Sequence, residues 1–246
     1  MSFSIEDLTF HLFSYLESLP GFRGLEYDQR PGATPAALSA WQRGELGLGL
    51  PDDLAGFLEF TDGFNLKWRA SGPTHEVVVG SVSLSGVAQL ARLDGSGPSP
   101  AALKACASAR AEAGEAWDEL GAWVGSSTVA AFALESNPKV GDSALVYPLD
   151  ANGGAKGPPE VWFRDRAGGW HWVARSFGAY WRLLLVHLGV LGWQSAFTPQ
   201  GLNPLTVQWM RLYCPERLIL DSAHHQRQQQ VQQLQLQLQQ ALSSPP

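Results

Sequence analysis

Histidine and cysteine side chains carry much of the proton-transfer, nucleophilic and metal-binding chemistry of proteins, and this chain has six His and two Cys. The only adjacent histidines are His224-His225, and no two histidines have the four-residue spacing that places both on one helical face around zinc. Cys106 and Cys214 lie far apart, and neither has a catalytic sequence around it. The sequence therefore predicts no zinc site and no nucleophilic cysteine, and it excludes a disulfide-rich scaffold.

Carboxylates, glycines and the remaining histidines also give no catalytic pattern. Asp52 and Asp53 open a predicted helix on different faces, which suits the helix dipole better than acid/base catalysis. Residues 44–53 have closely spaced glycines but neither the lysine nor the spacing of a phosphate-binding loop. His171 and His187 stand among apolar residues, so each is either a hydrogen-bonded core residue or a titrating functional group. We predict a binding protein with no catalytic residue, cofactor or metal; an enzyme with an unrecognised site is the alternative.

The composition predicts a folded, acidic domain. Apolar residues make up 45% of the 246 residues and charged residues only 16%, and the net charge is −6. A chain of this length and composition can bury a sizeable core, which excludes disorder for most of it. The net negative charge excludes a globally basic nucleic-acid binder. Because no signal peptide and no membrane-spanning run is recognisable, we expect a soluble, cytoplasmic protein without contact to a membrane.

Helix and strand signals predict an ordered domain before residue 217. Ser4 begins a helical run that continues to Leu19, where Pro20-Gly21 ends it. Residues from Pro100 to about Leu120 are rich in alanine and predict one helix. Further helices are expected to start at Pro35, Pro51, about Phe177 and Pro204, and strands are expected near Leu25–Gln29 and at Phe64–Arg69, Glu76–Gly80, Val129–Glu135 and Ala144–Leu149.

The clearest local motif is a hairpin made of Glu160–Arg166 and Trp170–Arg175, joined by Ala167-Gly168-Gly169. Side chains alternate along a strand, and here both faces carry large apolar groups, as in a central pair of strands. The hairpin belongs to a 48-residue block that holds six of the ten tryptophans: Trp162, Trp170, Trp172, Trp181, Trp193 and Trp209. Core packing is the plainer interpretation of this block, and a partner surface is the other.

Aromatic and arginine side chains are the usual anchors of protein interfaces. The aromatic block also contains four arginines, which could form a basic patch or could pair with Asp165 and other acids as surface ion pairs. Eight residues are the candidate partner-binding residues: Trp162, Arg164, Arg166, Trp170, Tyr180, Arg182, Trp193 and Gln194.

The end of the chain changes composition abruptly, because ten of the fifteen residues from Gln226 to Gln240 are glutamine. Its apolar residues form a narrow helical stripe, yet Leu234, Leu236 and Leu238 also alternate, so the segment is either helical or, on the other interpretation, β-prone or disordered. We predict a domain at residues 1–216 and a tail at residues 217–246. Deletion from Asp221 onward is expected to leave the stability of the domain nearly unchanged.

Two stretches resemble known families. Trp41, the Leu-Pro-x-Asp-Leu-x-x-Phe-Leu run at residues 50–58, the Asp-Gly-Phe turn at 62–64 and Trp68 together resemble the opening signature of the Smi1/Knr4-like (SUKH) domain family. This resemblance implies an α+β fold, in which helices pack against a mixed, largely antiparallel sheet, followed here by the Gln-rich tail.

The second stretch, within residues 143–216, is similar to the C-terminal half of the tubulin polyglutamylase complex subunit 2 family. It includes Glu-Val-Trp-Phe-x-Asp-Arg at 160–166, Phe-x-Ala-Tyr-x-Arg-Leu-Leu at 177–184 and Trp-Gln-x-Ala-Phe-Thr at 193–198. The resemblance implies a non-catalytic adaptor subunit, or a close paralogue of one. The implied partners are the other subunits of the complex, including a tubulin-tyrosine-ligase-like catalytic subunit, at microtubules, the centrosome or the ciliary basal body.

The net charge bears on how such a subunit reaches tubulin. Tubulin tails are acidic, and so is this chain, which disfavours direct electrostatic docking on them. We therefore expect contact with tubulin through partner subunits. The alternative function is a Smi1/Knr4-like protein-interaction module with non-tubulin partners, since the first stretch alone would suffice for it.

Overall fold

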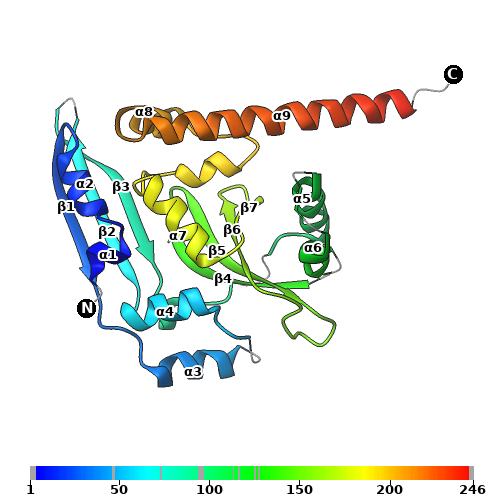
Figure 1. Ribbon diagram of the computed structural model, residues 1–246, viewed down its shortest axis with the longest axis horizontal. Helices are drawn as coiled ribbons and strands as arrows, with labels where there is room; N and C mark the ends of the chain where they lie inside the picture. The colour runs from blue at the N-terminus through cyan, green and yellow to red at the C-terminus, as the bar shows by residue number, and fades with distance from the viewer. Residues whose placement is uncertain are drawn as a thin grey trace.

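The computed structural model describes residues 4–45, 48–72, 74–93, 97–112, 114–115, 117–124, 126 and 128–243. Within these ranges the chain forms one seven-stranded antiparallel sheet whose strands lie in sequence order (Figure 1). The strands are β1 (Phe22–Gln29), β2 (Phe64–Ser71), β3 (Glu76–Leu84), β4 (Thr128–Asn137), β5 (Gly141–Leu149), β6 (Glu160–Asp165) and β7 (Trp170–Ala174). The α+β fold predicted from the sequence is confirmed, as is each of the predicted strands.

Helices cover both faces of the sheet. Those predicted to start near Pro35, Pro51, Phe177 and Pro204 are confirmed. The helices are α1 (Ile5–Leu8), α2 (Leu12–Ser18), α3 (Pro35–Gly44), α4 (Asp52–Phe60), α5 (Pro100–Glu112), α6 (Trp117–Val124), α7 (Phe177–Val186), α8 (Pro204–Tyr213) and α9 (Pro215–Ser243), with short 3₁₀ turns η1 (Val87–Gln89) and η2 (Trp193–Phe197).

The sheet has two parts, β1–β3 and β4–β7, which are joined by the pairing of Leu84 with Glu135. Away from this contact, β3 pairs with the segment that follows α7: Gly80 forms a bridge with Val190, and the Ser81 N–H donates to the Gly189 carbonyl at 2.9 Å. Figure 1 shows the consequence, with the two parts splayed and α7 lying between them. The position of α7 therefore fixes the angle between the two halves.

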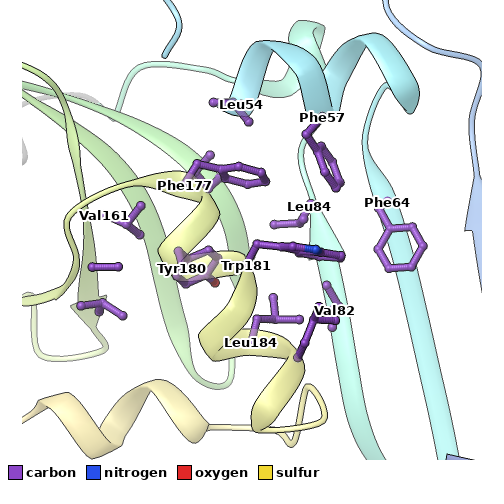
Figure 2. Close-up of a cluster of buried hydrophobic side chains, with 14 of the residues drawn as sticks. Leu54, Phe57, Phe64, Val82, Leu84, Val161, Phe177, Tyr180, Trp181 and Leu184 are labelled. Carbon is purple, nitrogen blue, oxygen red and sulfur yellow. The ribbon is translucent and has the colours of Figure 1, made fainter. Parts of the chain in front are cut away.

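The main core forms around α7 because its apolar residues recur at helical spacing. Phe177, Tyr180, Trp181, Leu184 and Leu185 are all buried. Figure 2 shows Phe177 and Trp181 directed toward α4 and β2, where Trp181 makes edge contacts with Phe57 and Phe64. Burial of aromatic side chains of this size supplies much of the stability of a core.

Residues of the first stretch hold the N-terminal half against α7. Asp53 lies in the first turn of α4, and its carboxylate accepts a hydrogen bond from the Gly178 N–H in the first turn of α7 at 2.7 Å. The negative charge therefore lies at the N-terminal ends of both helices. Gly63 has φ +91°, and a Cβ there would lie 3.0 Å from the Leu84 carbonyl oxygen. The Asp-Gly-Phe turn thus requires glycine for both its conformation and its close packing.

Tryptophan indoles of the same stretch connect distant segments. Trp41 Nε1 donates to the Leu90 carbonyl at 3.0 Å, and Trp68 Nε1 donates to the Leu188 carbonyl at 2.8 Å. A buried indole N–H needs such an acceptor, because leaving it unpaired costs about 1–3 kcal/mol. The signature tryptophans therefore serve the fold, and neither is available to a partner through its N–H.

The second face of the sheet is covered by α5 and α6. A separate apolar cluster forms there from Leu103, Trp123, Ala131, Ala144, Val146 and Trp162. The single helix predicted from Pro100 to about Leu120 is wrong, because α5 ends at Glu112 and α6 begins at Trp117. Gly114, between them, has φ +98°, which a helix does not accommodate.

The predicted hairpin is confirmed as β6 and β7, but it is not a central pair of strands. β6 lies between β5 and β7, whereas β7 is the last strand of the sheet. Both faces are nevertheless apolar, as predicted: Val161 and Phe163 are buried on the α7 side, and Trp162 is buried on the α5 side. The hairpin therefore uses both faces for packing.

The last helix, α9, includes the Gln-rich segment. Figure 1 shows it passing over the domain with its first turns and then extending beyond it. The predicted boundary between residues 216 and 217 falls inside this helix, whose first turns pack on the domain. No helix in the described ranges is long and apolar enough to cross a membrane.

Candidate partner-binding surface

Four of the eight candidate residues are buried, namely Trp162, Tyr180, Trp193 and Gln194. Trp162 lies 6.0 Å from Trp123 between ring centroids, and Trp193 lies 5.7 Å from Tyr180. These side chains belong to the core, so a partner cannot reach them in this conformation. Arg164, Arg166, Trp170 and Arg182 are the members of the set that keep exposed surface.

Tyr180 and Gln194 belong to a buried polar network around Glu135. One Glu135 oxygen accepts from the Ser83 N–H at 2.9 Å, and the other accepts from the Tyr180 hydroxyl at 2.9 Å and the Gln194 amide at 3.4 Å. No cation contacts this carboxylate among the described residues. Burial therefore raises the pKa of Glu135, and the hydrogen bonds offset that rise only in part.

This network predicts a pH-dependent difference in stability between the wild type and Glu135→Gln. A raised carboxyl pKa means that the folded protein binds the proton more tightly than the unfolded chain does. The favourable contribution of Glu135 is thus complete below the unfolded pKa of about 4.3 and is lost as pH rises through the folded pKa. Urea unfolding at pH 5 and pH 8 should show the wild type losing stability relative to Glu135→Gln; an unchanged difference would contradict the prediction.

Ion pairing with acidic residues, one of the two interpretations of these arginines, is confirmed for Arg164. Arg164 bonds to Asp142 through Nε at 3.0 Å and lies 5.9 Å above the ring of Trp170. Asp165 pairs with His171 at 2.9 Å and accepts N–H groups of its own turn. The structure thus brings Arg164 and Trp170 together at the end of the hairpin.

Arg166 and Arg182 are the exposed members of the candidate set, and they lie on different elements. Arg166 lies at the hairpin turn, whereas Arg182 projects from α7. A groove of about 400 Å³, the β7 groove, lies beside Arg182 between β7 and α7. Its lining residues are Trp172, Val173, Ala174, Arg175, Ala179, Arg182, Leu183 and Val186.

A second groove of about 320 Å³, the N-terminal groove, lies on the other side of Arg182 and Val186. It is lined by Thr9, Phe10, Leu12, Tyr15, Arg182, Leu185, Val186 and Leu188. Phe10 is 67% exposed at its rim, and Val186 is 50% exposed on the ridge between the two grooves. The two grooves and this ridge form one apolar surface, the groove face, with an arginine at its centre.

The backbone at the rim of the groove face is strained. Phe10 and His11 both adopt the left-handed conformation, with φ +50° and +58°. For a residue other than glycine, this conformation costs roughly 1–2 kcal/mol of folding free energy. This break divides the predicted Ser4–Leu19 helix into α1 and α2, so that prediction is wrong. The strained turn holds the Phe10 side chain outward.

Sequence reasoning missed Phe10, Tyr15 and Val186. Each of these residues is a single apolar residue next to helical core residues. Helical periodicity therefore predicts either a core position or an ordinary surface position for it, and not a binding surface. Only Phe10 gave a signal, since it stands between the core positions Leu8 and Leu12 and off their stripe.

Both cysteines are free thiols, one half-buried and one buried. Burial raises the pKa of both Cys106 and Cys214 to about 12, so both thiols stay protonated at neutral pH. No group of three or more His, Cys, Asp or Glu that could hold a metal ion is found in the described part of the chain.

Of the two interpretations of His187, the structure supports a hydrogen-bonded core residue. It is fully buried, its Nδ1 donates to the Leu183 carbonyl at 2.6 Å, and its Nε2 lies 2.8 Å from Asp221. Asp221 also accepts from Arg217, one turn earlier in α9. This cluster attaches the start of α9 to the end of α7.

Comparison with known proteins identifies clear relatives. The chain is 31% identical over 215 residues to tubulin polyglutamylase complex subunit 2 of Rattus norvegicus and to that of Mus musculus, covering 86% of this chain and 72% of each relative. It is 31% identical over 226 residues to the Homo sapiens protein of the same name, covering 86% of this chain and 70% of the relative. No family model and no solved structure matches the chain significantly.

Proposed function

Because this chain belongs to the family of tubulin polyglutamylase complex subunit 2, we propose that it is a non-catalytic adaptor subunit of such a complex. In this role it organises or localises a ligase-type catalytic subunit that glutamylates tubulin. The observation that carries the proposal is the 31% identity over 86% of the chain to proteins named as a subunit of this complex.

The structure supports the adaptor role through the groove face. Exposed Phe10 and Val186, with Arg182 between two grooves, provide the apolar and arginine anchors that interfaces use. We assign this surface to the other subunits, including a tubulin-tyrosine-ligase-like catalytic subunit. Since the chain carries a net charge of −6, contact with acidic tubulin is made through those subunits. The expected location is the cytoplasm at microtubules, the centrosome or the ciliary basal body.

A SUKH-type domain is the fold family that we propose for the chain. Support comes from the roles of the signature residues: Asp53 caps α7, Gly63 makes the turn into β2, and the Trp68 indole bonds to Leu188. These roles are structural and independent of any partner. They therefore also favour the second candidate function, a SUKH interaction module with non-tubulin partners.

Affinity capture with the whole chain from ciliated or neuronal cells tests the adaptor proposal. The wild type is expected to recover a ligase-like polyglutamylase together with the other subunits. An eluate without them would overturn the proposal, and a consistent set of non-tubulin partners would favour the alternative.

The variant Val186→Glu tests the groove face directly. A carboxylate on the ridge removes an apolar anchor and, one turn after Arg182 on α7, pairs with that arginine, so recovery of the subunits should fall at least about tenfold, equivalent to about 1.4 kcal/mol. Leu205→Glu, at a 59% exposed leucine on α8, is the matched control and should retain capture. Equal loss in both variants, with unchanged thermal unfolding, would show that the groove face is not the interface.

A further inference from the structure

Backbone strain in the described part of the chain gathers at the N-terminal groove. Apart from glycines, the described residues with positive φ are Phe10 at +50°, His11 at +58° and Leu188 at +56°. Phe10 and Leu188 line the groove, and His11 follows Phe10 directly. Residues other than glycine rarely adopt this conformation, and those that do cluster at functional sites. The strain therefore directs attention to this groove as a binding site.

The groove has a buried apolar floor and an exposed apolar rim. The floor consists of three buried leucines: Leu12, Leu185 and Leu188. The rim includes three exposed side chains: Phe10, Tyr15 and Val186. The indole of Trp181 fixes this arrangement, because its Nε1 donates to the Leu8 carbonyl at 2.9 Å and so holds the end of α1 against α7. The groove is thus formed before any partner arrives.

The N–H groups of the groove walls are already paired. The walls come from α2, α7 and the turns beside them, where the backbone bonds within the local chain. The N–H groups of Thr9, Phe10 and Leu12 donate to backbone carbonyls at 2.9–3.3 Å, and that of Leu188 does so at 2.9 Å. An extended peptide would find no donor here for its own carbonyls. An α-helix brings a backbone that is already paired, so it is the better occupant.

The charge of the groove selects the polar side of that occupant. Arg182 is the one charged residue among those that line the groove. It is exposed and makes no ion pair with any described residue. A helix that covers the groove removes water from this guanidinium, and a carboxylate on the helix would offset the lost hydration.

We propose that the N-terminal groove binds an amphipathic helix of a partner subunit, with apolar residues at i, i+3, i+4 and i+7 and an acidic residue beside them. The apolar face of this helix packs on the leucine floor and against Phe10, and its carboxylate pairs with Arg182. The inference rests on the proposed partner-binding role of the groove face and names the chemistry of the partner segment.

Constrained helical peptides test the proposal on the full chain. Fluorescent peptides of about five helical turns, closed by side-chain lactams, carry Leu, Ile, Phe or Met at i, i+3, i+4 and i+7. A flanking position is Glu or Lys in matched pools, and binding is followed by fluorescence anisotropy. Glu pools are expected to bind at least about tenfold more tightly than Lys pools. Linear isomers with alternating apolar residues, as in a strand, should bind more weakly by a similar factor.

Phe10→Gly separates binding from folding. Glycine adopts the left-handed conformation freely, so this variant should unfold at a urea concentration no lower than the wild type does. Loss of the aromatic ring should nevertheless weaken the tightest peptide at least about tenfold. His11→Gly, the same change at the left-handed neighbour that does not line the groove, is the matched control and should retain binding. Unchanged binding by Phe10→Gly, or an equal loss in both variants, would overturn the proposal.

Arg182→Glu tests the charge. It should weaken the Glu pools at least about tenfold and strengthen the Lys pools, because the complementarity is reversed. Arg211→Glu, the same change at an exposed arginine of α8, should alter neither. Absence of binding by every Glu pool, or equal binding by Glu and Lys pools, would contradict the assigned chemistry.

Vesicles of phosphatidylcholine and phosphatidylserine are the second probe, because a lipid surface is the other occupant that an apolar face with an arginine could contact. The net charge of −6 disfavours an anionic surface, so no cosedimentation is expected. Vesicle binding that is lost in Phe10→Gly would assign the groove to a membrane and overturn the helix.

The outcomes separate this inference from the adaptor proposal. Capture of the polyglutamylase subunits by the wild type and by Phe10→Gly alike, without peptide binding, would retain the adaptor role and remove the helix from this groove. Peptide binding without capture of those subunits would retain the groove chemistry and remove the assignment of the complex.

Discussion

Removal of residues 221–246 is expected to lower the free energy of unfolding by about 3–5 kcal/mol, whereas removal of residues 226–246 should change it by less than about 0.5 kcal/mol. The difference between the two truncations isolates the first turns of α9. The large loss expected for the 221–246 deletion replaces the expectation, drawn from composition, that everything from Asp221 onward can be deleted with little loss of stability.

The large effect follows from the buried position of Asp221. This residue is 4% exposed and contacts His187, which has no exposed surface, and Arg217. Removing the carboxylate leaves the Arg217 guanidinium and the His187 ring, 3.1 Å apart between Nε and Nε2, without an anionic partner in a medium that solvates them poorly. Nothing comparable follows residue 225, where the exposed Arg227 and the pair of His225 with Gln229 are the remaining described polar contacts.

Urea unfolding of both truncated chains measures this difference, and Asp221→Asn in the full-length chain keeps the test valid if the shorter truncation does not fold. The point variant preserves shape and removes the charge, so it should lose most of what the truncation loses. If Asp221→Asn and the 221–246 deletion were both as stable as the wild type, the cluster would not attach α9 to the domain.

In α9, composition predicted the Gln-rich C-terminal part better than the first turns, which pack on the domain. The glutamine content marks an abrupt change after Leu220, and one of the two structures left open, a helix, is what the chain forms through Ser243. The docking of Asp221 depends on His187, which is 34 residues away along the chain. No local periodicity encodes a contact over that distance.

Elements with strong local signals were predictable. Proline starts of α3 and α8, the Gly-containing turn between β6 and β7, and the helical spacing of Phe177, Tyr180 and Leu184 each depend on a few neighbouring residues. These signals fix the type of an element. They leave open which other element covers it.

That missing information explains the errors at the candidate site. Trp193 and Gln194 have the composition of interface anchors, but η2 turns them into the core beside Tyr180. Conversely, Phe10 and Val186 resemble ordinary helical residues, and only the tertiary arrangement leaves them exposed. Interface and core use the same residue types, so position in the fold decides between them.

Between Ser81 and Ala133 the key structural residue is Arg110. Arg110 lies in an alanine-rich helix and is only 9% exposed. Its guanidinium bonds to Glu115 and Glu160 at 2.8 Å each and lies 4.4 Å from the centre of the Trp172 ring. This arrangement fastens α5 to the hairpin, including the strand that borders the β7 groove.

Arg110→Met is therefore expected to destabilise the protein by about 3–5 kcal/mol, because it leaves the buried Glu160 carboxylate with only the Trp172 indole as a hydrogen-bond donor. Burial already raises the pKa of Glu160, and loss of the cation raises it further. A raised carboxyl pKa removes stability as pH rises, so the variant should lose more relative to the wild type at pH 8 than at pH 5.

Urea unfolding of a double-mutant cycle separates charge from packing. Arg110→Met with Glu160→Gln should be more stable than Arg110→Met alone, since no buried carboxylate then lacks its cation. Arg211→Met, at an exposed arginine of α8, is the matched control and should cost less than about 0.5 kcal/mol. If Arg110→Met cost no more than this control at either pH, the cluster would be a surface ion pair of little consequence, and apolar packing of Leu103 and Trp123 alone would hold α5 and α6 on the sheet.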